Sequence, residues 1–337
     1  MRSHGLTPSR AFTLSRAARV LARPLRWAGR PSLKGAVRTA TLTLALAQGP
    51  TTSAPVLVAA MIPVLFAGVA KAAVVSTPIW TLDGAQDGAN VGWSVATAGD
   101  VNGDGYSDVI VGEPYVDIPN FGTNGGRTRV YHGGPNGVDN GADWSAYGSS
   151  QSRLGHWVSP AGDVNGDGYD DVIVGAPYYS DGQTNEGAAW LYLGSANGLQ
   201  NSPAWSRQGG QDAARLGWCV STAGDVNGDG YDDVTIGAPF YTNNISEQGR
   251  VYIFLGGAGG LSNTPHRIID GTGENDAMGW AVATAGDVNA DGYDDVLLSA
   301  IYYEGLFTPD DCGAVYCYHG SSTGVDGTLD WADYGTQ

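Results

Sequence analysis

The feature that most constrains this chain is a nine-residue segment that occurs four times at an almost constant spacing. The first copy, Asp-Val-Asn-Gly-Asp-Gly-Tyr-Ser-Asp, covers residues 100–108, and the others cover 163–171, 225–233 and 287–295. Their first aspartates lie 63, 62 and 62 residues apart. Because a fixed period of this size is typical of repeat architectures, we expect four copies of one structural unit.

The segment has the composition of a loop that binds a hard cation. Side chains that carry oxygen stand at positions 1, 3, 5 and 9, and position 6 is glycine. Ca²⁺ takes about six to eight oxygen ligands, and a glycine lets the chain turn sharply enough to direct them at one centre. The backbone carbonyl at position 7 would supply another oxygen. The sequence therefore predicts about four bound Ca²⁺ ions, and the predicted ligands are Asp100, Asn102, Asp104, Tyr106 and Asp108; Asp163, Asn165, Asp167, Tyr169 and Asp171; Asp225, Asn227, Asp229, Tyr231 and Asp233; and Asp287, Asn289, Asp291, Tyr293 and Asp295.

A polar hairpin turn without metal is the alternative, because Asp, Asn and Gly are common turn residues. A turn does not need three carboxylates in one small loop, where unneutralised charges would repel each other, so the four copies favour Ca²⁺. The fourth copy has Ala290 where the others have glycine, but this position is not a predicted ligand. An EF-hand or a dockerin-like repeat fits less well, since position 12 lies in an apolar run and no helical period flanks the loops.

Four short strands are predicted around each loop. The unit opens with glycine and tryptophan near residues 92, 217 and 279, and with Gly-His-Trp at residue 155, and it continues as a strand of small residues. An apolar strand leaves the loop and ends in Gly-Glu-Pro or Gly-Ala-Pro in three copies, and two further strands follow. One four-stranded sheet cannot bury both of its faces, and stacking copies around an axis solves this problem. The predicted fold is therefore an all-β propeller of four-stranded antiparallel blades.

The combined motifs resemble a known family. The Gly-Trp opening, the Asp-x-Asn-x-Asp-Gly-x-x-Asp loop and the Gly-Ala-Pro ending are similar to FG-GAP repeats, those of the N-terminal propeller of integrin α-subunits. The resemblance covers about residues 78–337; its departures are tryptophan for phenylalanine at the opening, and Ser299 and Ile301 in place of Gly and Pro. It implies a seven-bladed ring, calcium on the loops between the first and second strands, and ligand binding on the opposite rim.

The ends of the repeats bear on the size of the ring. Ile79–Gly84 reads as a fourth strand that no first three strands precede. Seven repeats of 62 residues would need 434 residues, whereas residues 79–337 number 259. We therefore expect four blades of a seven-bladed ring, with roughly 170 residues lacking. The alternative is a closed four-bladed ring, which would leave the first strand as an unpaired edge.

The N-terminal segment has a different composition. Residues 1–72 are predicted to form a basic leader and a secretory signal, and residues 73–337 the repeats. The apolar run at 54–70 contains two prolines and is too short for a comfortable membrane span, and small residues around Lys71 suit a cleavage point. A disordered basic leader, an uncleaved anchor and a mitochondrial-type leader are the alternatives. The predicted location is secreted or at the cell surface.

Charge is divided unequally along the chain. None of the 34 Asp and Glu residues precedes Asp83, while ten of the 17 Lys and Arg residues lie at or before Lys71. The remainder has 7 basic and 34 acidic residues, a net charge of −27, and four Ca²⁺ ions would reduce it to −19. Such a body repels nucleic acid and anionic membranes, so neither is predicted as a partner.

A binding function is predicted for the rim opposite the metal loops. Its loops, between the second and third strands, are rich in Tyr, Asn, Asp and Gly, which suit adaptable contacts with protein or glycan. These loops are Tyr115–Gly126, Tyr178–Gly187, Tyr241–Gly249 and Tyr302–Gly313. The predicted function is a calcium-binding adhesion or binding module with an extracellular protein or glycan ligand. Ordinary solvated loops are the alternative for any one of them.

Catalysis within the chain is not predicted. His132 and His319 occupy equivalent third-strand positions, which favours a packing role, and no Gly-x-Ser-x-Gly motif stands on a strand-to-helix turn. A structural spacer and an accessory domain of a larger extracellular hydrolase remain alternatives. The three cysteines fit no dense disulfide framework; Cys312 and Cys317 are close enough in sequence to be considered as a pair.

Overall fold

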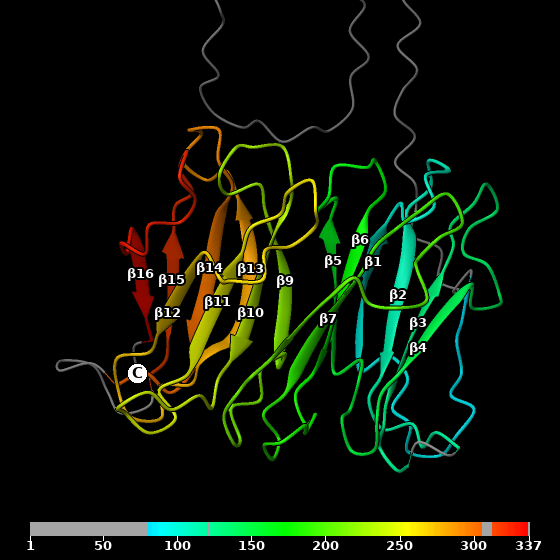
Figure 1. The fold of residues 1–337 in the computed structure, drawn as a ribbon, viewed down its shortest axis with the longest axis horizontal. Helices are drawn as coiled ribbons and strands as arrows, with labels where there is room; N and C mark the ends of the chain where they lie inside the picture. The colour runs from blue at the N-terminus through cyan, green and yellow to red at the C-terminus, as the bar shows by residue number, and fades with distance from the viewer. Residues whose placement is uncertain (1–79, 120–121, 305–311, 336–337) are drawn as a thin grey trace, which may run out of the picture. The chain divides into compact units, whose positions relative to one another are not determined.

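The computed structural model describes residues 80–119, 122–304 and 312–335. Within these residues the chain forms sixteen strands and no helix, and the strands form four four-stranded antiparallel sheets (Figure 1). The predicted all-β class and the four-stranded antiparallel blades are confirmed. The leader and secretory signal predicted for residues 1–72 lie outside the described residues. In the part of the chain that is described, no helix is long and apolar enough to cross a membrane.

Each sheet contains four strands that are consecutive in sequence, and we number the sheets as blades 1 to 4. Blade 1 contains β1 (Ser94–Gly99), β2 (Asp108–Glu113), β3 (Arg127–Tyr131) and β4 (Trp144–Tyr147). Blade 2 contains β5 (Trp157–Gly162), β6 (Asp171–Ala176), β7 (Ala188–Tyr192) and β8 (Trp205–Gln208). Blade 3 contains β9 (Cys219–Gly224), β10 (Asp233–Ala238), β11 (Arg250–Phe254) and β12 (Arg267–Asp270). Blade 4 contains β13 (Met278–Gly286), β14 (Asp295–Ala300), β15 (Ala314–Tyr318) and β16 (Trp331–Tyr334).

The nine-residue segment connects the first two strands of every blade. In blade 1 the pairing runs from Ser94 opposite Gly112 to Gly99 opposite Asp108, and a bulge follows Thr97. The other three blades have a bulge at the same point. A bulge adds an unpaired residue and increases the local twist. The chain is thus turned immediately before the first aspartate of each predicted metal loop.

The hydrophobic cores lie between consecutive blades. The core between blades 1 and 2 joins Ile110 and Val130 to Val172 and Val174. Two further cores join blade 2 to blade 3 and blade 3 to blade 4. The first strands β1, β5, β9 and β13 are neighbours in that order. A blade therefore buries its apolar faces only through its neighbours, as the repeat pattern predicted.

The glycines of the opening and ending motifs form two sides of one contact. A Cβ atom added to Gly112 would overlap the carbonyl oxygen of Gly155, which opens the next blade, and Gly175 meets Gly217 in the same way. Only glycine permits this approach of two backbones. The corresponding residue of blade 4 is Ser299, for which the described residues include no following blade.

The segment before β1 was predicted to be a fourth strand, and the structure differs from this prediction. Residues 80–84 form no strand. Trp80 nevertheless packs edge-on against Tyr131, with ring centroids 5.1 Å apart, and its indole Nε1 donates a 3.0 Å hydrogen bond to the carbonyl oxygen of Asp139. Trp144 of β4 makes the same pair of contacts with blade 2, onto Tyr192 and the carbonyl oxygen of Gln200. The predicted fourth-strand tryptophan is thus in place without the strand.

Candidate metal loops and opposite rim

The side-chain oxygens at positions 1, 3 and 5 point into each loop. In blade 1 the two carboxylate oxygens of Asp100 accept hydrogen bonds from the backbone N–H groups of Asp104, at 3.0 Å, and Gly105, at 2.8 Å. The amide oxygen of Asn102 accepts from the N–H of Asp104, and a carboxylate oxygen of Asp104 accepts from the N–H of Tyr106, both at 2.9 Å. The other three loops repeat this pattern.

The aspartate at position 9 is placed differently from the other predicted ligands. Asp108 is fully buried, and its two oxygens accept hydrogen bonds from the N–H groups of Val101, at 3.0 Å, and Gly133, at 2.8 Å. The equivalent aspartates of blades 2 to 4 are bonded in the same way. Burial raises the pKa of Asp171 and of Asp233 to about 7, against the effect of these hydrogen bonds. Position 9 thus ties each loop to the end of the third strand.

The donor set suits a hard cation, although the carboxylates are not drawn together. Carboxylate and amide oxygens are the ligands that Ca²⁺ prefers, and an oxygen that accepts one hydrogen bond retains a second lone pair. Among the described residues, no three His, Cys, Asp or Glu side chains are gathered closely enough to hold a metal ion. Positions 1, 3 and 5 face the loop centre, and the buried carboxylate at position 9 would be held in its charged form by a nearby dication. The predicted ligand set therefore stays a prediction.

Consecutive loops are linked through position 8, which sequence reasoning did not single out. A carboxylate oxygen of Asp170 accepts a 2.7 Å hydrogen bond from the N–H of Asp100 in the preceding blade. The next two blade pairs repeat the link at 2.9 and 3.0 Å. Blade 1 has Ser107 at this position. The signal available in the sequence was that three of the four copies end in Asp-Asp, whereas the first copy ends in Ser-Asp.

Aromatic side chains form a row at the opposite end of the first strands. Trp93, His156, Trp218 and Trp280 occupy equivalent positions, and their ring centroids follow one another at 5.7, 4.8 and 4.8 Å. These are the aromatic residues of the Gly-Trp opening. Trp93 remains 49% exposed. The row is therefore exposed chiefly at Trp93, on the rim where ligand binding was predicted.

Two arginines extend this row toward the loops. The guanidinium carbon of Arg153 lies 3.8 Å from the ring centroid of Tyr178, and that of Arg215 lies 4.4 Å from the centroid of Phe240. Burial lowers the pKa of His156 to about 4, and the charges of both arginines act in the same direction. His156 is therefore neutral at physiological pH.

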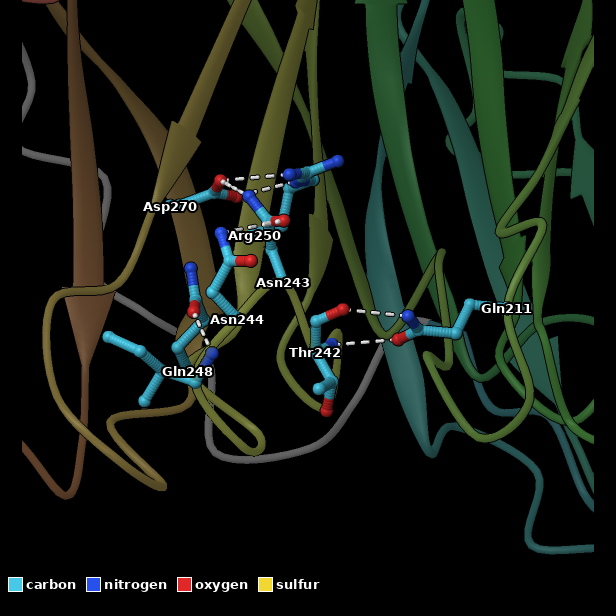
Figure 2. Close-up of polar contacts among 8 residues, drawn as sticks. Gln211, Thr242, Asn243, Asn244, Gln248, Arg250 and Asp270 are labelled. Atoms are coloured by element: carbon cyan, nitrogen blue, oxygen red, sulfur yellow. Dashed lines mark hydrogen bonds and ion pairs between the residues drawn. The ribbon is translucent and has the colours of Figure 1, made fainter.

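The loop between the second and third strands of blade 3 is braced by the connection that leads from blade 2 into blade 3. Figure 2 shows Gln211, which follows β8, reaching Thr242 in the loop after β10. Its side-chain amide donates to the carbonyl oxygen of Thr242 and accepts from the N–H of the same residue, each at 2.7 Å. Asn243 in that loop donates to Asp270, which also pairs with Arg250 (Figure 2). The predicted binding loop of blade 3 is thus held in position by side-chain contacts. Residues 120–121 and 305–311 of the other loops lie outside the description.

The remaining candidates are two histidines and three cysteines. His132 and His319 were predicted within the third strands, but each follows directly after the end of one, β3 or β15. Each lies beside an aspartate of its own blade, Asp143 at 3.8 Å and Asp330 at 3.4 Å. Cys312 and Cys317 are not paired; both are free thiols, as is Cys219.

Comparison with known proteins relates these motifs to a repeat family. The profile of the FG-GAP repeat family matches residues 91–132, 154–192 and 217–254. The chain carries FG-GAP repeats. Each matched segment runs from the aromatic opening through the predicted metal loop to the third strand. The fourth repeat, with Ala290 and Ser299, lies outside the matches.

The similar curated proteins are integrin α-subunits. Integrin alpha-V of Gallus gallus is 30% identical over 225 residues, which cover 64% of this chain and 20% of that protein. Integrin alpha-PS2 of Drosophila melanogaster is 30% identical over 238 residues, 66% of this chain and 16% of that protein. Integrin alpha-IIb of Mus musculus is 36% identical over 159 residues, 44% of this chain and 15% of that protein. The chain thus spans about a fifth or less of the length of these relatives.

One solved structure gives a weak likeness. The crystal structure of the exotype rhamnogalacturonan lyase YesX matches with a TM-score of 0.41 and 15% sequence identity, over 72% of this chain and 48% of that chain. A score of this size has no bearing on function. The FG-GAP repeats and the four antiparallel sheets together identify the fold as that of β-propeller blades.

Proposed function

We propose that this FG-GAP chain is an extracellular, non-enzymatic binding module whose repeats are ordered by Ca²⁺. The observation that carries the proposal is the fourfold repetition of one loop geometry, with oxygens at positions 1, 3 and 5 directed inward and position 9 anchored to the third strand. Similarity to integrin α-subunits supports a binding or adhesion role and a location outside the cell or at its surface.

Calcium has a structural role in this proposal. The loops and the aromatic row stand at opposite ends of the first strands, so the ions would not contact a ligand on the rim. Binding to the folded state alone stabilises it by RT ln(1 + [L]/Kd), which is about 1–3 kcal/mol per site for calcium at roughly 10–100 times Kd. Extracellular calcium modules work in the millimolar range, which fits an exported protein.

The ligand side of the proposal is tested by a binding screen. The full chain would be applied to arrays of glycans and of extracellular matrix proteins, with calcium and with a chelator. The proposal expects saturable binding to a protein or glycan that is weakened when calcium is removed. Absence of any binding across both arrays, or turnover of ester or glycoside substrates, would contradict a binding role.

A further inference from the structure

Two arginines beside the aromatic row have no partner that matches their charge. Arg153 and Arg215 each stand two residues before the glycine that opens blade 2 or blade 3. Neither forms an ion pair or a side-chain hydrogen bond with a described residue, and the Nε atom of each is buried without a hydrogen-bond partner there. By contrast, three of the other five arginines of the repeats pair with a carboxylate. The described part of a strongly acidic body thus leaves two positive charges unneutralised.

Aromatic rings hold both guanidinium groups in place. The guanidinium carbon of Arg153 lies 4.9 Å from the ring centroid of Tyr115 and 3.8 Å from that of Tyr178. That of Arg215 lies 4.9 Å from the same Tyr178 centroid and 4.4 Å from that of Phe240. Each arginine therefore contacts rings of two neighbouring blades, and Tyr178 is shared. A guanidinium group stacked on rings presents its N–H groups at its edge, as a planar fork that matches a carboxylate.

The backbone at these positions is unfavourable for arginine. Its φ is 56° at Arg153 and 53° at Arg215, and the equivalent residues of blades 1 and 4, Asn90 and Ala277, have φ of 53° and 54°. Asparagine tolerates this left-handed conformation, whereas most other side chains adopt it with strain. Because blades 1 and 4 form with asparagine and alanine at this position, the fold does not require arginine there. Strain of this kind is characteristic of binding sites.

The two charges act together on the aromatic row. Burial lowers the pKa of His156 to about 4, and the charges of both arginines lower it further. His156 lies between Trp93 and Trp218 in the row, so the positive potential reaches the rings that line the rim. No Asp or Glu precedes Asp83, and the N-terminal segment therefore contains no side-chain anion for this site. The rim thus attracts an anion in a body that otherwise repels anions.

The surroundings of the two arginines favour a sugar as the carrier of that anion. Trp93, which is 49% exposed, meets Tyr115 edge-on with ring centroids 5.5 Å apart, and Tyr115 is one of the two rings that Arg153 contacts. An exposed indole face stacks on the apolar face of a pyranose ring, so a sugar-binding surface adjoins a carboxylate-binding fork. The net charge of −27 repels a chain of many negative charges. A single acidic sugar in an otherwise neutral glycan matches these conditions.

We propose that Arg153 and Arg215 bind the carboxylate of an acidic sugar, such as a uronic acid, whose ring stacks on the exposed aromatic side chains beside them. Charge-assisted hydrogen bonds from arginine are roughly twice as strong as neutral ones, so the carboxylate is the main source of affinity. The proposal deepens the proposed binding function and rests on it, because it names the chemical class of the ligand. It does not depend on calcium.

The test compares two sugars that differ in one group. The full chain, with ¹⁵N-labelled tryptophan, is titrated with methyl glucuronide or with methyl glucoside, which has the same ring without the carboxylate. The indole N–H signals of Trp93 and Trp218 are followed by NMR. We expect the glucuronide to bind about tenfold more tightly, as hydrogen bonds to a charged group imply. Equal affinities, or no shift of either signal with the glucuronide, overturn the proposal.

A third probe separates a sugar from an acidic peptide. N-acetylglutamate amide carries a carboxylate on a peptide unit and has no sugar ring. We expect it to bind more weakly than methyl glucuronide, because it cannot stack on Trp93 as a pyranose does. Affinity equal to or greater than that of the glucuronide would assign the site to an acidic side chain of a protein and overturn the proposal.

Variants that copy other blades locate the site. Arg153→Asn copies Asn90 and Arg215→Ala copies Ala277, so both variants are expected to fold. Each should weaken binding of methyl glucuronide about tenfold and leave that of methyl glucoside unchanged. The control is Arg207→Gln, because Arg207 also lacks a described carboxylate partner but stacks on an aromatic ring from β8, the outermost strand of blade 2. Unchanged glucuronide binding in both copied variants, or an equal loss in Arg207→Gln, contradicts the proposal.

A final variant tests whether the chain fills the site itself. Asp310 and Asp311 of the fourth rim loop lie outside the described residues, and both are replaced by asparagine. We expect this variant and the parent to bind methyl glucuronide equally, whereas binding that appears only in the variant overturns the proposal. Failure of the glucuronide alone leaves the wider binding function standing if the arrays reveal another ligand, and absence of binding across both arrays contradicts that wider function.

Discussion

Asp170 of the second loop accepts a 2.7 Å hydrogen bond from the backbone N–H of Asp100, the first residue of the first loop. Through this hydrogen bond, blade 2 fixes the backbone of a predicted calcium ligand in blade 1. Because the next two blade pairs repeat it, the four loops form a linked series in which each blade supports the one before it. The same hydrogen bonds therefore order the loops and hold neighbouring blades together.

The link predicts an asymmetric effect of substitution. Asp170→Ser, which copies the residue of blade 1, removes the acceptor and is expected to lower the free energy of unfolding by about 1–2 kcal/mol, as loss of a hydrogen bond to a charged group does. Urea denaturation measures it. The control is Ser107→Asp, an exposed position that links to no described blade, which should change stability by less than about 0.5 kcal/mol. Equal effects of the two substitutions would argue against the link.

Glycine at position 4 of the loops predicts a second contrast. A Cβ atom on Gly103 would meet the Tyr169 ring of the next blade at 2.6 Å, and the backbone there has a φ of +72°. Gly103→Ala is therefore expected to destabilise the protein by roughly 1–3 kcal/mol, from strain and overpacking. Ala290, with a φ of 60°, occupies the same position in blade 4, where the described residues include no following tyrosine.

Ala290→Gly serves as the matched control. It relieves a left-handed alanine and should leave stability within about 1 kcal/mol of the parent. Midpoints of denaturation measure both variants. If Gly103→Ala is as mild as Ala290→Gly, the contact between the loop and the next blade does not contribute to stability.

His156 predicts a pH dependence of stability. Its pKa is about 4 in the folded state, lowered chiefly by burial, against an ordinary value of 6.5. Between these two pH values the unfolded state binds a proton that the folded state does not, so stability is lost as pH falls from about 6.5 to about 4. The full difference amounts to roughly 3 kcal/mol. His156→Phe keeps an aromatic ring and removes this contribution.

The comparison is made by urea denaturation of both proteins across that pH range. The parent should lose more stability than His156→Phe as the pH falls, and the two should differ by a constant above about pH 7. Parallel curves throughout the range would show that His156 is not buried in its neutral form.

The repeat period and its motifs were sufficient to predict the strands and their order, because each blade repeats the same alternation of small, apolar and glycine residues. The departures at Ala290 and Ser299 could not be interpreted from sequence alone. The structure explains the glycines of the other copies, because in blade 1 Gly103 meets the Tyr169 ring of the next blade and Gly112 meets Gly155. Such contacts join residues of different repeats and leave no local pattern.

The sites were predictable to a different extent. The inward oxygens at positions 1, 3 and 5 follow from spacing within one loop. The double role of Asp108, which is buried and bonded both to Val101 in its own loop and to Gly133 after the third strand, depends on where the third strand passes.

The central claim is that the four loops bind Ca²⁺ and that the ions stabilise the blades. Isothermal titration calorimetry of the full chain with Ca²⁺, after treatment with a chelator, tests it most directly. The claim predicts a heat of binding with about four ions per chain, one for each loop, and a melting temperature that rises with calcium concentration. No heat of binding, together with a melting temperature that the chelator leaves unchanged, would contradict it.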